Sequence, residues 1–210
     1  MINKFILPFE QKMAKKFTNL SPEEITAYCL RFKLSPQNTP PYDLKTRYYY
    51  IEKEILSLKR DKDGNQAYSE EQINKLIFRN YSKNTVQAII NLHEKLIEFL
   101  SPDSIFKIAA HDGGAKNLEA VQTAFEPLSK LGFTTEQVVK IASHDGGSKN
   151  IEAVQTAFAA LRGLGFNTEQ VVKIASHDGG SKNLEAVQTA FAALRGLGFS
   201  AEQVVKIVSH

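Results

Sequence analysis

The stretch Ser-His-Asp-Gly-Gly-Ser-Lys-Asn at residues 143–150 returns unchanged at 176–183 and with two changes at 110–117. Its histidine recurs with a strict spacing of 33 residues, at His111, His144, His177 and His210. A fixed period of about 20 to 50 residues is typical of a solenoid or another array of repeats. The sequence therefore predicts stacked repeats, each of which presents one copy of this stretch.

The copy at residues 133–165 predicts two helices joined by a turn. Thr134 can cap the first helix, and Gln137 stands three residues later, where it completes a capping box. This helix is expected to end near Ala142, because the glycines at 146–147 are each unfavourable inside a helix by about 1 kcal/mol and allow a tight turn. The His-Asp pair that precedes the glycines is therefore expected on the turn.

The second helix of this copy is expected to begin near Ser148 and to end before Gly165, which suits a left-handed cap. Its apolar residues have helical spacing and are Ile151, Val154, Ala157, Phe158 and Leu161. A unit of 33 residues buries too little surface to fold alone, so neighbouring units must complete its core. The predicted fold class is an all-α solenoid of two-helix repeats.

The same pattern predicts the organisation of the whole chain. The repeats are expected at 100–132, 133–165 and 166–198, followed by a truncated fourth repeat at 199–210. Residues 68–99 are a degenerate copy, in which Ser69–Ile73 matches the helix opening and Arg79-Asn80-Tyr81 replaces the His-Asp-Gly-Gly turn. Residues 1–67 are expected to form a helical N-terminal capping region, since terminal repeats must close the apolar end of a stack.

The composition separates the repeats from the part in front of them. Residues 1–99 hold 16 basic and 12 acidic side chains, whereas residues 100–210 hold 10 and 11. A single cysteine, Cys29, excludes an internal disulfide framework and favours a reducing compartment. No stretch approaches the about 20 apolar residues of a membrane span, so we expect a soluble protein without a membrane partner.

The loop at 61–72 resembles the calcium loop of an EF-hand at its first, third and fifth positions, Asp61, Asp63 and Asn65. Gln66 stands where that loop needs glycine, and Gln72 replaces the glutamate that would give two oxygens to the ion. A polar turn is therefore favoured over a calcium site, and we expect no metal ion and no cofactor.

Stacking with a constant step places the equivalent turns along one line, where we expect the function. Each turn offers an aspartate: Asp112, Asp145 and Asp178. Helix-start amides beside a lysine favour an anion such as phosphate, and we expect it at Gly113, Gly114, Lys116, Gly146, Gly147, Lys149, Gly179, Gly180 and Lys182. A carboxylate only accepts hydrogen bonds, and in the major groove of DNA the cytosine amino group is its natural donor.

The unit Glu-Gln-Val-Val-x-Ile-Ala-Ser-His-Asp-Gly-Gly at 136–147 and 169–180 resembles the repeat of transcription activator-like (TAL) effectors and of the shorter TAL-like proteins of endosymbiotic bacteria. The resemblance implies a right-handed superhelical solenoid that binds double-stranded DNA as a monomer, with one base per repeat and no catalytic residue. It implies that the three aspartates read consecutive cytosines. It also implies that the histidines brace the turns: His111, His144, His177 and His210.

The chain departs from the family pattern in several places. Its repeats are one residue shorter than those of the plant-pathogen proteins, and Ser148-Lys149 replaces Lys-Gln after the glycines, so the phosphate role passes to Lys149. The chain has no tryptophan, and the family's tryptophan that favours a thymine before the array has no counterpart. Arg79 or Tyr81 are candidates for that role. Non-specific DNA contacts are expected from the basic residues of the degenerate copy: Lys75, Arg79 and Lys83.

Two other classes of function are possible from the sequence. His-Asp pairs occur in metal-dependent phosphohydrolases, but each repeat offers one such pair on a separate layer, and a metal needs its ligands around one ion. A helical solenoid can also bind protein or RNA, but its concave surface would then need aromatic or varied side chains, whereas the turns here are identical. The expected location is the bacterial cytoplasm or, for a secreted effector, the host nucleus.

Overall fold

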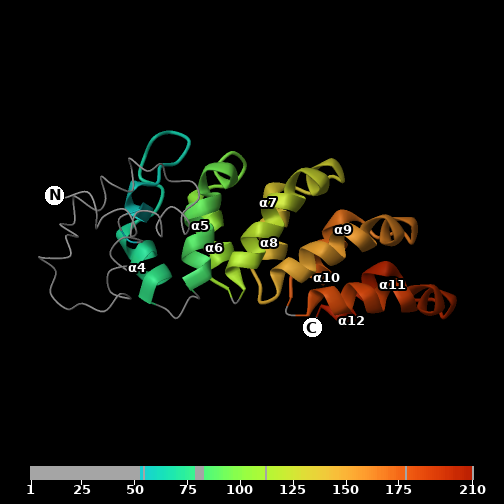
Figure 1. Ribbon diagram of the computed structural model, residues 1–210. Helices are drawn as coiled ribbons and strands as arrows, with labels where there is room; N and C mark the ends of the chain where they lie inside the picture. Colours follow the sequence, from blue (N-terminus) through green and yellow to red (C-terminus); the bar gives the residue numbers. More distant parts are fainter. Residues whose placement is uncertain (1–52, 54, 79–82, 112, 178, 210) are drawn as a thin grey trace, which may run out of the picture. The chain divides into compact units, whose positions relative to one another are not determined.

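The computed structural model describes residues 53–210, except 54, 79–82, 112, 178 and 210 (Figure 1). The chain divides into two compact units, Met1–Glu94 and Lys95–His210. Most of the helical region expected at 1–67 lies outside the described residues. Within the described residues, the secondary structure is helical, with one isolated antiparallel bridge between Arg60 and Gln66.

The second unit alternates short and long helices, as the repeat pattern predicts. In chain order they are α6 (Pro102–Ala109), α7 (Gly114–Lys130), α8 (Thr135–Ala142), α9 (Gly147–Gly163), α10 (Thr168–Ala175), α11 (Gly180–Gly196) and α12 (Ala201–Val208). The long helices pack in succession, α7 against α9 and α9 against α11, and each short helix contacts the long helix of its own repeat where both are described (Figure 1). The all-α solenoid of two-helix repeats is thus confirmed.

Each short helix of the array begins with a side-chain cap. Thr134 accepts a hydrogen bond from the amide of Gln137, and the Gln137 side chain accepts one from the amide of Thr134, which forms the predicted capping box. Asn167 and Ser200 make the same reciprocal pairs at α10 and α12. Such a cap is worth about 1 kcal/mol, so the sequence defines these helix starts locally.

The long helices end in a Schellman motif, in which two amides beyond the helix bond back to its last carbonyls. After α9, the amide of Gly165 donates to Arg162 and that of Phe166 donates to Leu161, at 3.0 Å each. Gly165 has a φ of 97°, which confirms the left-handed cap. The chain then turns directly into the next short helix.

The two glycines before α9 meet different requirements. Gly146 lies before the helix with a φ of 74°, a left-handed conformation that favours glycine. Gly147 is the first residue of α9, one position earlier than expected, and a Cβ atom there would lie 2.2 Å from the Ala142 carbonyl oxygen. The first glycine thus supplies backbone conformation, whereas the second allows the two helices of a repeat to approach closely.

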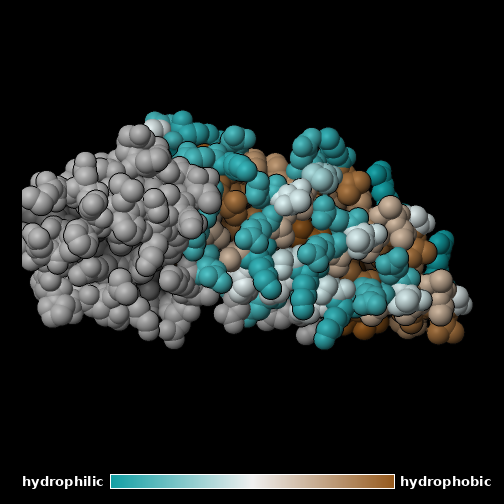
Figure 2. All heavy atoms as spheres, viewed as in Figure 1, coloured by the Kyte–Doolittle hydropathy of each residue, from teal (hydrophilic) through white to brown (hydrophobic). Residues whose placement is uncertain are grey.

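The core of the array is built from the predicted apolar stripe and from aromatic pairs. All five stripe residues of α9 are buried, namely Ile151, Val154, Ala157, Phe158 and Leu161. Phe133 meets Phe158 edge to face, with ring centroids 4.8 Å apart. Hydrophobic residues reach the surface at the end formed by α11 and α12 (Figure 2). There Ile207 is 62% exposed, whereas its equivalent Ile174 is fully buried.

The described part of the first unit contains α4 (Glu70–Phe78) and most of α5 (Lys83–Leu96), whose last residues belong to the second unit. Ser69 and Gln72 form the same reciprocal pair as the array caps, with the amide of each donating to the side chain of the other. The helix opening that the sequence predicts for the degenerate copy is therefore present.

The loop that resembles an EF-hand is closed by its own hydrogen bonds. The Asp61 carboxylate accepts from the amides of Asp63 and Asn65, at 2.9 and 2.8 Å, and from the Asn65 side chain at 3.3 Å. Gly64 follows with a φ of 82°. Across the described residues, no three His, Cys, Asp or Glu side chains gather where they could hold a metal ion. In this structure the Asp61 carboxylate is thus occupied by hydrogen bonds within the loop.

Candidate nucleic-acid interface

The turns between the short and long helices repeat one backbone geometry. In each turn the amide of the second glycine donates to the histidine carbonyl at 2.9 Å, and these donors are Gly114, Gly147 and Gly180. The first glycine of each turn has nearly the same φ, 78° at Gly113, 74° at Gly146 and 78° at Gly179. The described residues of the three turns therefore share the same geometry.

Among the aspartates expected to read bases, Asp145 is described and its side chain is 57% exposed. Its carboxylate lies 3.7 Å from Nδ1 of His111, which belongs to the preceding repeat. This contact is an ion pair only when the imidazole is protonated. Asp112 and Asp178 lie outside the described residues.

The histidines of successive turns form a row. The ring centroids of His111 and His144 are 6.0 Å apart, and those of His144 and His177 are 6.4 Å apart. His210 lies outside the described residues. The backbone of each described histidine also takes part in the turn, because its carbonyl accepts from the second glycine. Bracing by the imidazole rings remains a prediction.

Sequence reasoning missed a buried asparagine in each of two long helices, α7 and α9. Asn117 is fully buried, donates through Nδ2 to the carbonyl of His144 at 3.2 Å, and accepts through Oδ1 from the amide of Ser148 at 2.8 Å. Asn150 repeats both bonds with His177 and Ser181. The signal was available, because a polar residue recurs at an otherwise buried position of the stripe.

Fewer helix-start amides are open to an anion than the sequence predicts. At the start of α9, the amides of Gly147, Ser148 and Lys149 already donate to acceptors inside the protein, as do their equivalents in α11. In contrast, the amide of Gly146 has no acceptor within the described part of the chain.

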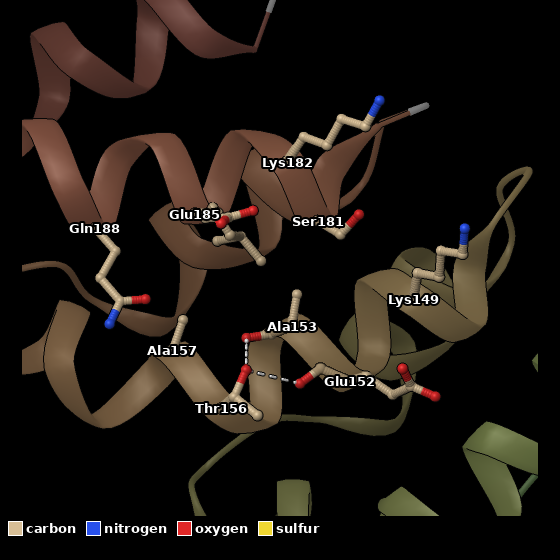
Figure 3. A pocket seen from close by; sticks show the side chains of 10 residues that line it. Lys149, Glu152, Ala153, Thr156, Ala157, Ser181, Lys182, Glu185 and Gln188 are labelled. Carbon is tan, nitrogen blue, oxygen red and sulfur yellow. Dashed lines mark hydrogen bonds between the residues drawn. The ribbon is translucent and has the colours of Figure 1, made fainter.

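The lysines near the helix starts are exposed in every described repeat, at Lys116, Lys149 and Lys182. Lys149 and Lys182 extend their ammonium groups in the same direction (Figure 3). Below them an open groove of about 380 Å³ runs between α9 and α11, with Glu152 and Glu185 among its lining residues. Positive charge thus lies at the turn side of this groove, and negative charge lies further along the helices.

The basic residues expected to bind DNA non-specifically are only partly described. The Lys75 ammonium is 2.6 Å from the carboxylate of Glu71, one helical turn earlier, and this hydrogen bond lowers the pKa of Glu71. Such exposed pairs contribute little to stability, so Lys75 can exchange this partner for a phosphate. Arg79 and the side chain of Lys83 lie outside the described residues.

Stacked two-helix repeats whose turns share one geometry define an α-solenoid. The model of the TAL effector repeat family matches residues 112–144, 145–177 and 178–210. Over these residues the repeats are similar to TAL effector repeats, which is consistent with a TAL-like repeat protein. No curated protein matches the chain.

Members of this family bind double-stranded DNA and are not enzymes, so the family supports a DNA-binding repeat array in general terms. No helix in the described part of the chain is long and apolar enough to cross a membrane.

Proposed function

We propose that the array reads duplex DNA through the major groove, one base per repeat, and that each His-Asp turn selects cytosine. The observation that carries this proposal is the repetition of one turn geometry, with nearly equal φ angles at Gly113, Gly146 and Gly179. A partner that meets identical turns at a constant step must itself be repetitive, and duplex DNA is such a partner.

The aspartates supply base choice in this proposal. A carboxylate accepts hydrogen bonds and cannot donate them, so it favours the cytosine amino group and opposes the acceptors of guanine and thymine. The exposed carboxylate of Asp145 fits this role. Asp112 and Asp178 are assigned to the neighbouring bases by the repeat, and the target is then three consecutive cytosines on one strand.

The phosphate contacts fall to the lysines and to the first glycine of each turn. The ammonium groups of Lys149 and Lys182 extend in the same direction, so both can contact phosphates of one nucleic-acid backbone. The amide of Gly146 can also donate to a phosphate oxygen. Lys75, Arg79 and Lys83 add contacts that do not depend on the base sequence. Residues 1–99, with a net charge of +4, then supply most of the affinity.

The test compares two substitutions in one repeat. Asp145→Asn is expected to relax the preference at the middle base by about 1 to 3 kcal/mol, since an amide both donates and accepts. Lys149→Ala is expected to weaken all duplexes alike and to shallow the salt dependence. Competition binding with a CCC duplex and its single-base variants separates the two effects. An unchanged cytosine preference in Asp145→Asn would refute the base assignment.

The affinity of the whole chain provides a second check. Three single contacts add little to non-specific binding, whose dissociation constant is about 10⁻⁴ to 10⁻⁶ M near physiological salt. We expect micromolar or weaker binding that falls steeply with salt, and a larger loss from neutralising Lys75, Arg79 and Lys83 together than from losing one aspartate. Equal binding of RNA of the same sequence would favour an RNA-binding solenoid instead.

A further inference from the structure

The buried asparagines of α7 and α9 each belong to one repeat and contact the turn of the next. Asn117 lies in α7, and its two hydrogen-bond partners, the His144 carbonyl and the Ser148 amide, lie on either side of Asp145 and the glycines. Asn150 in α9 brackets the following turn in the same way, through His177 and Ser181. Each described pair of bonds thus runs forward along the chain.

The chemistry of these positions requires a side-chain amide. The histidine carbonyl accepts from the second glycine and takes a second donor from the asparagine, and the serine amide needs an acceptor. An asparagine side chain offers both a donor and an acceptor from one planar group. Asn117 is fully buried and Asn150 is 1% exposed, so water does not readily replace the lost bonds. Unpaired polar groups at such sites are costly, and the turn is therefore held where the asparagine places it.

We infer that Asn117 and Asn150 are positioning residues for base choice and that each acts one repeat ahead of its own position. Asn117 sets the turn that carries Asp145, and Asn150 sets the turn that carries Asp178. The inference rests on the proposed function, because the position of an aspartate affects base choice only if the aspartates contact the bases. Base reading is then directional, since each turn depends on the repeat before it.

Asn183 provides a matched control in the chain. It occupies the equivalent place in α11, but its Nδ2 donates to the carbonyl of Val208 in α12. Asn183→Ala therefore removes the same side chain from the same helix position without touching the turns of the three assigned bases.

The first experiment measures base choice at each position separately. Asn117→Ala, Asn150→Ala and Asn183→Ala are compared with the wild-type chain in competition against single-base variants of the CCC duplex. Asn117→Ala is expected to lower the cytosine preference at the second base by about 2- to 10-fold, the equilibrium factor of one ordinary hydrogen bond, and to leave the first base unchanged. Asn150→Ala is expected to act at the third base, and Asn183→Ala at none.

The second experiment requires no DNA. Amide hydrogen exchange is expected to become faster at Ser148 but not at Ser181 in Asn117→Ala, and at Ser181 but not at Ser148 in Asn150→Ala. Circular dichroism checks that the helices persist in each variant. A variant that loses its fold is replaced by Asn→Asp, which keeps the acceptor for the serine amide and loses only the donor.

The outcomes distinguish a failure of the forward-positioning inference from a failure of the proposed base-reading function. Exchange that rises only one repeat ahead, together with a loss of preference at that same base, supports the inference. Exchange that rises in the variant's own turn or equally in both turns overturns it, and so does a preference lost at the variant's own base. A wild-type chain that shows no cytosine preference refutes the proposed function, whereas forward-only exchange in the same variants still supports the forward coupling.

Discussion

The two units hold their buried polar groups in different ways. In the first unit, the fully buried ring of His93 hydrogen-bonds to the Tyr68 hydroxyl at 2.9 Å and to the Arg60 carbonyl at 2.7 Å. This anchor occurs once and joins segments that are distant in sequence. In the array, each buried asparagine joins only neighbouring repeats. A single change should therefore affect the described first unit as a whole, but the array only locally.

An ion pair next to His93 adds to this difference between the two units. The Lys59 ammonium is 2.9 Å from a Glu94 carboxylate oxygen, and the Lys59 side chain is only 10% exposed. The hydrogen bond from Lys59 lowers the pKa of Glu94. The hydrogen bonds of His93 and the ion pair of Lys59 thus both involve α5, whereas the asparagine bonds of the array are distributed along it.

The largest effect is expected from His93→Ala. The change leaves a cavity and two unpaired polar groups, the Tyr68 hydroxyl and the Arg60 carbonyl, and costs about 3 to 5 kcal/mol. Denaturation followed by amide exchange is expected to show lost protection in α4 and the loop before it, with α8 to α11 retained. Uniform loss of protection over the array would contradict the expectation that a change at His93 affects only the first unit.

A smaller and local effect is expected from Gly147→Ala. The added Cβ would lie 2.2 Å from the Ala142 carbonyl oxygen, so backbone must move, at a cost of about 1 to 3 kcal/mol. Gly163→Ala is the matched control, since no atom lies within 4 Å of its Cβ position. Chemical denaturation is expected to show a loss for the first variant and none for the second. Equal effects would show that the close approach is unimportant.

The anchor also predicts a pH dependence for the first unit. Burial lowers the pKa of His93, and the hydrogen bond to the Arg60 carbonyl only partly offsets this. The unfolded chain therefore binds the proton more tightly. Stability is fully present above the ordinary pKa of about 6.5 and falls as the pH drops below it, by at most about 1.4 kcal/mol per pH unit.

The measurement for this prediction compares denaturation of the wild-type chain and of His93→Gln between pH 8 and about pH 5. Glutamine donates and accepts hydrogen bonds but does not titrate. The variant is expected to lose less stability than the wild-type chain over this range. Parallel curves would assign the pH dependence to other groups, with Glu94 the nearest candidate.

The features of this structure that the sequence predicts are mostly those set by residues close together in the chain. The 33-residue period indicates the repeat, and the capping residues and glycine caps act within a few residues, so the two helices of a repeat and their ends follow from the sequence. The forward bonds of Asn117 join residues about 30 positions apart, and no local rule contains them. The sequence also assigned the helix-start amides to an anion, because it could not show that Asn117 already binds the amide of Ser148.

The smallest expected effect concerns a hydroxyl beneath the turn. Ser143 is 4% exposed, and its Oγ has no hydrogen-bond partner within the described residues, in contrast to the partnered hydroxyl of Tyr68. The first repeat has Ala110 at the equivalent position. Ser143→Ala is therefore expected to leave stability unchanged or to raise it by about 0.5 kcal/mol, whereas Tyr68→Phe, which unpairs His93, should cost about 1 to 2 kcal/mol.

Denaturation of the two variants side by side tests whether a buried hydroxyl matters only where it has a partner. The serine change is also expected to leave cytosine preference at the middle base intact, because the bonds from Asn117 to His144 and Ser148 do not pass through Ser143. If Ser143→Ala instead lowered stability as much as Tyr68→Phe, the hydroxyl would have a partner such as bound water. The Ser143 hydroxyl would then help Asn117 to stabilise the turn, and the two units would differ less in how they stabilise their buried polar groups.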